Sequence, residues 1–249
     1  MWEDASHPLS PRNPYNMAKG KKYRAAAELI EKEAYTLDEA IELVKRTSIT
    51  RFDGSLEIHA KLGLDPKQAD QNIRTMVNMP NGTGKDIKVV AFVAEGDIKA
   101  ATDAGATEAG TEELVKKIQT GWTDFDVAVA VPDQMKMIGK VAKVLGQKRL
   151  MPSPKAGTVT PDFANAISEL KAGRIEIRVD KEANLHNIVG KMSFEDAKLK
   201  ENILTFVRKV QEVKPASSKG TYLESLTLAS TMGPGVPVDP KNAIEESRA

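Results

Sequence analysis

The side chains able to do catalytic chemistry are few. The sequence contains no cysteine and three histidines, His7, His59 and His186, which lack the spacing of metal ligands. Without cysteine there is no thiol nucleophile, disulfide or zinc knuckle. The carboxylates are scattered through amphipathic segments, as is typical of solvated helix faces. The sequence therefore predicts no enzyme, no cofactor and no metal site.

A glycine-rich segment at residues 82–86 has some resemblance to a phosphate-binding loop. A Walker loop requires a glycine five positions before Gly84 and a Ser or Thr after the lysine, but Met79 and Asp86 stand there. The turn after the next apolar run, at 94–97, lacks the glycines of a dinucleotide site. Backbone freedom explains these glycines, so we interpret the segment as a hinge.

A binding surface has better support. Arg51 and Phe52 precede residues 55–62, where polar and apolar residues alternate as in a strand with one solvated face. The polar side chains of this segment are Ser55, Glu57, His59 and Lys61. An aromatic ring, cations and hydroxyls on one surface are suited to RNA. Core packing at a helix–strand junction is an alternative explanation for Phe52.

A second candidate for binding is the turn Thr231-Met232-Gly233-Pro234. A threonine hydroxyl can bond a ribose 2′-hydroxyl, a methionine can lie against a base, and a glycine lets the backbone approach closely. The alternative interpretation of these four residues is a turn that ends a strand and has no binding role, which their composition also fits.

The elements that must position these residues follow from periodicity. The capping-box spacing of Thr36 and Glu39 predicts a helix from about 36 to 47. Further predicted elements are strands at 55–62, 73–79 and 174–179, an extended piece through 189, a helix at about 194–213 and a last strand at about 222–231.

The middle of the chain has a different pattern. Residues 87–93 and 126–131 are nearly continuous apolar runs, as in strands that are covered on both faces. Helical segments are predicted near 96–104, 111–120, 133–145 and 161–171. Strands that alternate with helices indicate an open parallel sheet.

The change of pattern predicts two domains, one of them discontinuous. We expect an α+β sandwich domain interrupted by a Rossmann-like parallel α/β domain. The predicted boundaries are a disordered leader at 1–16, the discontinuous domain at 17–81 plus 174–240, the inserted domain at 82–173 and a tail at 241–249. Two adjacent crossings would form the hinge, at Gly82, Gly84 and Gly173.

Composition limits the kinds of partner. The 249 residues have a formal net charge of +1, which argues against a broad, non-specific phosphate binder and leaves room for a small, shaped nucleic-acid site. No run approaches the roughly 18 apolar residues of a membrane-spanning helix, so we expect no membrane partner. The composition fits a reducing compartment, and we predict a cytoplasmic protein.

Several blocks of sequence together resemble the L1 family of bacterial large-subunit ribosomal proteins. In chain order they are 17–24, Phe52-Asp53 with 57–63, 70–74, 121–126, 154–159, 190–194 and 231–234. The resemblance implies a two-domain stalk protein that binds large-subunit ribosomal RNA, takes part in movement and release of deacylated exit-site tRNA, and represses its own operon mRNA at the leader. It also implies a monomer within the ribosome.

The resemblance also implies where RNA binds. The family's RNA surface carries over onto Arg51, Phe52, Ser55, Glu57, Lys191, Ser225, Thr231, Met232 and Gly233, with His186 and Ser193 as weaker candidates. Two classes of protein remain as alternatives: an enzyme that binds a nucleotide or metabolite on the parallel domain, and a domain that makes only protein contacts. Neither explains the residues around Phe52 and Met232.

Overall fold

The computed structural model describes residues 20–68, 70–218 and 220–248. The predicted leader at 1–16 lies outside these residues. The chain begins with α1 (Lys21–Ala27), α2 (Leu37–Arg46), β1 (Ser55–Leu62) and β2 (Arg74–Asn78). The middle segment contains β3 (Val89–Phe92), α3 (Ile98–Asp103), β4 (Glu108–Gly110), α4 (Glu112–Gln119), β5 (Val127–Ala130), α5 (Met135–Ile138), α6 (Ala142–Gln147) and α7 (Phe163–Ala172). The last segment contains β6 (Arg174–Arg178), β7 (Asn184–Lys191), α8 (Asp196–Glu212), β8 (Leu223–Ser230), β9 (Gly235–Val238) and α9 (Pro240–Arg248).

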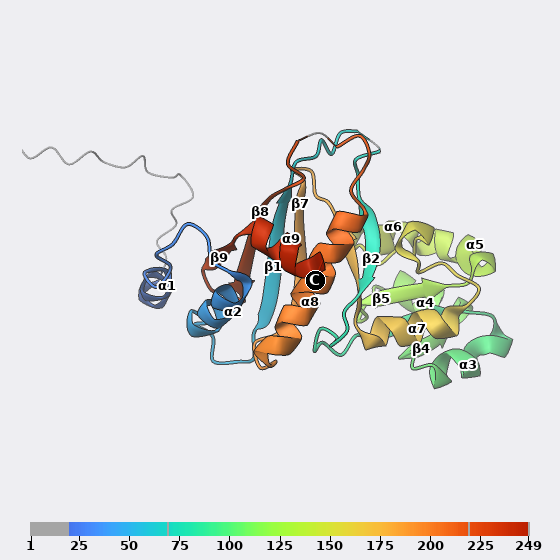
Figure 1. Ribbon diagram of the computed structural model, residues 1–249. Coiled ribbons are helices and arrows are strands. Elements are labelled where there is room, and N and C mark those ends of the chain that lie inside the picture. The colour runs from blue at the N-terminus through green and yellow to red at the C-terminus, as the bar shows by residue number, and fades with distance from the viewer. Residues whose placement is uncertain (1–19, 69, 219, 249) are drawn as a thin grey trace, which may run out of the picture.

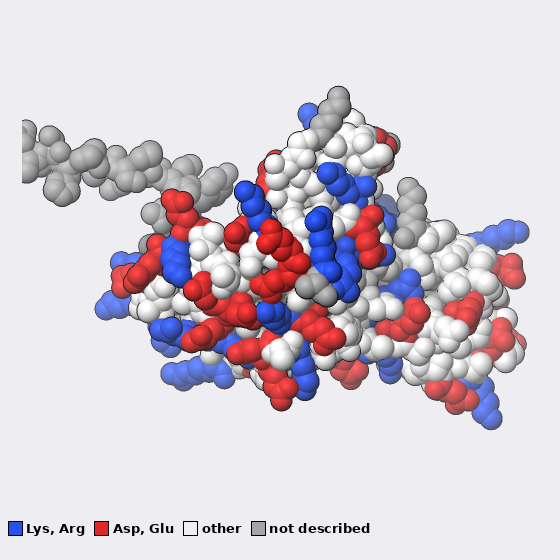
Figure 2. All heavy atoms as spheres, in the orientation of Figure 1, with Lys and Arg blue, Asp and Glu red and all other residues white. Residues whose placement is uncertain are grey.

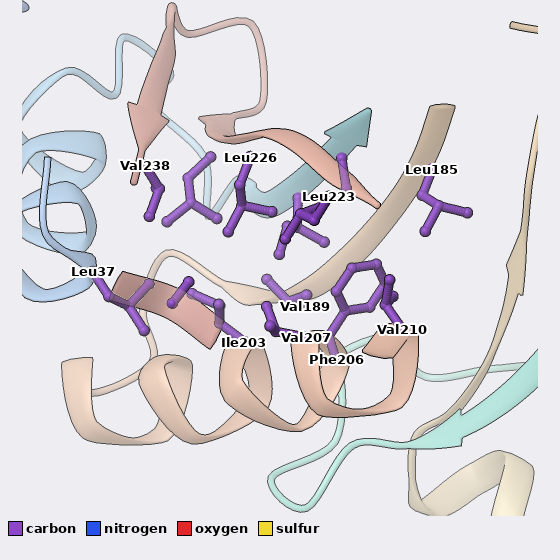
Figure 3. Close-up of a cluster of buried hydrophobic side chains, with 14 of the residues drawn as sticks. Leu37, Leu185, Val189, Ile203, Phe206, Val207, Val210, Leu223, Leu226 and Val238 are labelled. Carbon is purple, nitrogen blue, oxygen red and sulfur yellow. The ribbon is translucent and has the colours of Figure 1, made fainter. Parts of the chain in front are cut away.

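An antiparallel sheet in the order β7-β1-β8-β9 is the centre of the first structural unit (Figure 1). Residues of β1 alternate between buried and partly exposed along the whole strand. The buried set packs against α2, α8 and α9, so helices cover one face of the sheet. Figure 3 shows this core, in which Ile203, Phe206 and Val207 of α8 point at side chains of the strands.

Helix α2 begins where the sequence predicts. The Thr36 hydroxyl accepts a hydrogen bond from the Glu39 N–H, and the Glu39 carboxylate accepts one from the Thr36 N–H. This capping box satisfies two of the N–H groups that a helix start leaves unpaired. Its apolar side, which includes Ile41 and Val44, is buried against the sheet.

A parallel sheet in the order β4-β3-β5 is the centre of the second unit. All four residues of β3 are buried, because helices pack on both faces of this sheet. One apolar core contains side chains of α4, α5 and α6, and the other contains side chains of α3 and α7. The predicted fold class, an α+β sandwich domain with an inserted parallel α/β domain, is confirmed.

The two connections between the units lie against each other. Strands β2 and β6 form an antiparallel pair, and the chain crosses next to it at Gly82 and Gly173. Both glycines have positive φ, +64° and +110°, and a Cβ on Gly173 would lie 2.5 Å from the Gly82 Cα. Only glycine fits such an approach.

Asn202 of α8 holds the first connection to the sheet. Its side chain is fully buried, and its Nδ2 donates to the Gly82 carbonyl (2.9 Å) and the Val189 carbonyl (2.7 Å). Its Oδ1 accepts from the Asn81 N–H (3.1 Å). One amide thus satisfies backbone groups of the connection and of β7.

The end of the chain differs from the prediction. The strand predicted as the last is followed by β9 and by α9, neither of which was predicted. Pro237 weakens the strand signal in β9, yet it is tolerated at the edge of a sheet. The Asp239 carboxylate accepts the Lys241 N–H (2.9 Å) at the start of α9, and Ala243 is buried against the core. The nine residues of α9 contain too few apolar side chains to give a detectable helical periodicity.

Three smaller differences lie elsewhere. Helix α1 and the three-residue strand β4 were not predicted from the sequence. The helix predicted at 133–145 is divided into α5 and α6 by a 3₁₀ turn that begins at Gly139. Glycine is a poor residue for a helix interior, which explains the interruption.

The helical side of the molecule has a mixed charge pattern. Figure 2 shows lysine and arginine interspersed with aspartate and glutamate on this face, without a large area of one sign. Ion pairs such as Lys200 with Asp38 (2.7 Å) and with Glu246 (2.9 Å) link α8 to α2 and α9. None of the helices in the described ranges is long and apolar enough to cross a membrane.

We predict that Asn202→Asp destabilises the protein by about 3 kcal/mol at neutral pH, because a carboxylate would face the two carbonyls that the amide now satisfies. Urea denaturation followed by far-UV circular dichroism measures the change. Asn242→Asp is the matched control, since its Oδ1 accepts the Leu37 N–H (3.3 Å), its single side-chain bond within the described ranges, and a carboxylate can do the same. Equal stability of the two variants would contradict the role of Asn202.

Candidate RNA-binding surface

The second face of the antiparallel sheet is polar and carries no helix among the described residues. We call it the polar face: Ser55, Glu57, His59 and Lys61 of β1, His186, Ile188 and Lys191 of β7, and Ser225, Thr227 and Ala229 of β8. Cross-strand pairing sets these residues side by side, with Glu57 between Ile188 and Ala229. The predicted solvated face of β1 is therefore the middle of a wider surface.

Three separate chain segments meet at one end of the polar face. Because β1 is antiparallel to both neighbours, its start lies beside the ends of β7 and β8. Residues 51–54, 191–193 and 231–233 are thereby brought together, and we call this group the loop end. It contains six of the nine main candidates, and Ser55 directly follows its first segment: the six are Arg51, Phe52, Lys191, Thr231, Met232 and Gly233.

Two large apolar side chains are exposed at the loop end. Phe52 is 64% exposed and Met232 is 73% exposed. Core packing, the alternative explanation for Phe52, is therefore wrong. An exposed aromatic ring and an exposed thioether on these adjoining segments offer apolar surface to a flat partner.

Thr231 fastens the loop end to β1. Its Oγ1 accepts the Ser55 N–H (2.9 Å) and also lies 3.3 Å from the Ser55 carbonyl oxygen, while the Thr231 N–H donates to that same carbonyl (3.1 Å). The hydroxyl that the sequence suggested for a ribose contact thus already has internal partners, and it positions Met232 and Ser55.

The turn after Thr231 has a demanding backbone. Met232 has φ of +64°, a left-handed conformation that costs a non-glycine residue roughly 1–2 kcal/mol. A Cβ on Gly233 would overlap the Ser230 Oγ, so a larger residue there would displace that hydroxyl. Such strain at an exposed residue is typical of a functional site.

A second link joins residues 51–54 to residues 191–193. The Asp53 carboxylate accepts hydrogen bonds from the Ser193 N–H (3.1 Å) and the Ser193 hydroxyl (2.9 Å). The Met192 N–H donates to the Gly54 carbonyl (2.9 Å), and the Lys191 ammonium lies 3.4 Å from the Ser55 hydroxyl. Sequence reasoning did not single out Asp53 or Gly54, because the pairing spans about 140 residues and leaves no local signal.

Not all candidates lie at the loop end. Glu57 is in the middle of the face, whereas Ser225 pairs with Lys61, six residues and about 20 Å along β1 from Ser55. His186 pairs with His59 in that same distant half.

The two histidines of the polar face contact each other. The Nδ1 atoms of His59 and His186 are 2.9 Å apart, so one ring donates and the other accepts, and at least one ring is neutral. Burial, together with the nearby His186, lowers the pKa of His59, while the carboxylate of Glu57 opposes this shift. The Asp180 carboxylate lies 3.6 Å from the other ring.

The parallel sheet has its own crevice at the carboxyl ends of its strands. The cavity of about 730 Å³ is lined by Glu95, Glu112 and Glu113 among other residues. Ligands of open α/β sheets bind at such a place, yet three carboxylates repel a phosphate. Within the described ranges no three His, Cys, Asp or Glu residues are placed to hold a metal ion.

Comparison with known proteins gives the family. The model of the ribosomal protein L1p/L10e family matches residues 44–234. The chain belongs to this family. The match includes every candidate residue from Arg51 to Gly233, so the resemblance stated from the sequence is confirmed, and the expectation that the chain is no enzyme agrees with a family of ribosomal proteins.

Two relatives of the L1p/L10e chain described here are named "Large ribosomal subunit protein uL1". The one from Kosmotoga olearia is 46% identical over 228 residues, which are 91% of this chain and 99% of the relative. The one from Salinispora arenicola is 49% identical over 235 residues, which are 93% of this chain and 99% of the relative. The similarity thus extends over both structural units.

We predict that the titration of His59 makes the stability depend on pH with a definite sign. Because the folded state lowers the pKa of His59, the unfolded state binds more protons below the ordinary histidine pKa. His59 should therefore contribute its whole stabilisation to the free energy of unfolding above the ordinary histidine pKa. This contribution should be lost as the pH falls from that value to the pKa of His59 in the folded state. Urea denaturation at pH 8 and pH 5 measures the loss.

The assignment uses NMR, since the chain has only three histidines. The pKa of His59 should rise toward its ordinary value in His186→Ala, while Lys99→Gln, an exposed site on α3 of the parallel unit, should leave it unchanged. An ordinary pKa for His59 in the unmodified protein would contradict the pairing.

Proposed function

We propose that this L1p/L10e chain is a structural component of the large ribosomal subunit that binds large-subunit ribosomal RNA through the polar face and its loop end. The observation that carries the proposal is that Phe52 and Met232 are both exposed on adjoining segments. Hydrogen bonds between Thr231 and Ser55 hold these two segments together. Two large exposed apolar side chains on segments that are bonded together offer a surface for a partner, and unstacked RNA bases are such a partner.

The loop end supplies each type of contact that looped RNA uses. Phe52 and Met232 offer apolar surface to bases, and the Gly233 backbone permits close approach. Arg51, which is exposed and has no ion pair in the described part of the chain, and Lys191 offer positive charge to phosphates. Ser55, Glu57 and Ser225 offer hydrogen bonds along the sheet, with His186 and Ser193 at its borders.

The family assignment supports finer proposals about the role. We place the protein in the cytoplasm as a monomer within the ribosome, in the stalk region. There it assists movement and release of deacylated tRNA at the exit site and represses translation of its own operon mRNA. For such movement the boundaries at 17–81 plus 174–240 and at 82–173 define the two domains, and Gly82, Gly84 and Gly173 form the hinge between them.

The alternative of a nucleotide-binding parallel domain has less support. Its crevice is lined by glutamates, and it lacks the glycines that allow a backbone to approach a pyrophosphate. A nucleotide would have to bring enough cation to offset these charges.

We predict that Phe52→Ala and Met232→Ala each weaken binding to a stalk fragment of large-subunit ribosomal RNA about tenfold, because base stacking contributes on the order of 1–3 kcal/mol per base. Both side chains are exposed, so the melting temperature should change little. Fluorescence anisotropy titration measures the affinity.

Leu29→Ala provides the control for lost apolar surface, because Leu29 is 42% exposed and lies outside the polar face. It should bind as the unmodified protein does. If all three variants bound equally, the loop end would not be the RNA site.

A second prediction concerns salt. A chain of net charge +1 should bind through shape and 2′-hydroxyl contacts more than through counterion release, so the affinity for the stalk fragment should fall only shallowly with salt. Titrations at several salt concentrations give the slope, with a shape-scrambled hairpin of equal length as control. A steep slope, or equal binding to both RNAs, would contradict recognition by shape.

A further inference from the structure

A groove away from the loop end runs between the parallel unit and strand β6. It consists of two adjoining cavities of about 700 Å³ and 330 Å³, and Arg149, Glu176 and Arg178 line both. Arg149 comes from the segment after α6, and Arg178 comes from the end of β6. We call this the arginine groove, and it is built from both structural units.

The two arginines of the groove are available to a partner. Both side chains are exposed, and in the described part of the chain neither guanidinium has a hydrogen bond or ion pair. Three carboxylates, those of Glu176, Asp180 and Glu182, also line the larger cavity, but the first two are already engaged, so Arg149 and Arg178 outnumber the one carboxylate left. Glu176 pairs with Arg74, and Asp180 accepts the N–H groups of the turn that follows it.

The backbone at Arg149 supplies an independent observation. Arg149 has φ of +60°, a left-handed conformation that glycine would adopt without penalty. An arginine that is kept in this conformation, with its guanidinium exposed and unpaired, indicates that the side chain has a use there.

The arginine groove continues from the polar face. His186, which pairs with His59 on the face, also lines the larger cavity, together with Lys181 of the turn between β6 and β7. The Asn187 Nδ2 donates to the Glu176 carbonyl (2.8 Å), so β7 and β6 are fixed to each other at this border. A long ligand that lies on the half of the polar face around His59 and His186 can therefore extend directly into the arginine groove.

We propose that the arginine groove binds the sugar–phosphate backbone of the RNA that occupies the polar face, with Arg149 and Arg178 as phosphate contacts. This inference rests on the proposed function. A guanidinium presents a planar fork of donors that matches two phosphate oxygens, and two such groups on separate segments suit a ligand with repeated charges. The loop end then reads shape and bases, while the groove holds the backbone.

The test uses the full chain, the stalk fragment of large-subunit ribosomal RNA and a version of that fragment shortened from each end in turn. Arg149→Gly and Arg178→Gln should each weaken binding of the full fragment about tenfold at low salt and reduce the salt slope by about one. Shortening the end that occupies the groove should abolish these differences. Arg149→Gly relieves the strained backbone, so its melting temperature should be unchanged or higher, and unfolding cannot explain weaker binding.

Two controls separate this inference from the proposed function. Lys99→Gln removes an exposed charge of α3 outside the groove and should leave affinity and slope unchanged. Phe52→Ala should weaken binding of the full and shortened fragments alike without changing the slope. If Phe52→Ala weakened binding while both arginine variants kept the original affinity and slope, the arginine groove would be overturned and the proposed function would stand. Absence of RNA binding by the unmodified protein would overturn both.

Discussion

The structure depends on the register of β1 between its antiparallel neighbours β7 and β8. A strand has a side-chain period of two, so a slip of one residue would move Leu56 and Ile58 out of the core and Glu57 and His59 into it. The apolar core under α8 and the polar face are thus two sides of one pairing. A change of register that disrupts the apolar core would therefore also disrupt the polar face.

The same pairing assembles the loop end from distant parts of the chain. Antiparallel strands bring the start of β1 to the ends of β7 and β8, and side chains then fix the segments: Thr231 to Ser55, and Ser193 to Asp53. Asn202 extends this order to the connection at Gly82. The exposed Phe52 and Met232 are therefore presented by a rigid framework, which lowers the entropy that binding must overcome.

Local patterns in the sequence predicted local structure well. The capping box at Thr36, the alternation from Ser55 and the apolar run of β3 each reflect one element and its immediate solvent exposure. Contacts between residues far apart in the sequence could not be predicted from such local patterns. The His59–His186 contact and the Asp53–Ser193 bonds depend on strand pairing, and the exposure of Phe52 depends on which loops surround it. Strand β9 was missed because Pro237 opposes a strand locally, while the pairing with β8 stabilises it.

Backbone strain connects the two candidate surfaces. Among the described residues, positive φ at non-glycine positions occurs at Arg149, Ala183 and Met232. Ala183 is buried, and its conformation serves the turn into β7, whereas Arg149 and Met232 both carry exposed side chains. Glycine at either exposed position would relieve the backbone strain but remove the side chain. The retained side chains therefore make sense as contacts, one apolar at the loop end and one cationic in the arginine groove. A nearly neutral protein can bind RNA in this way, through a few positioned groups instead of a general positive field.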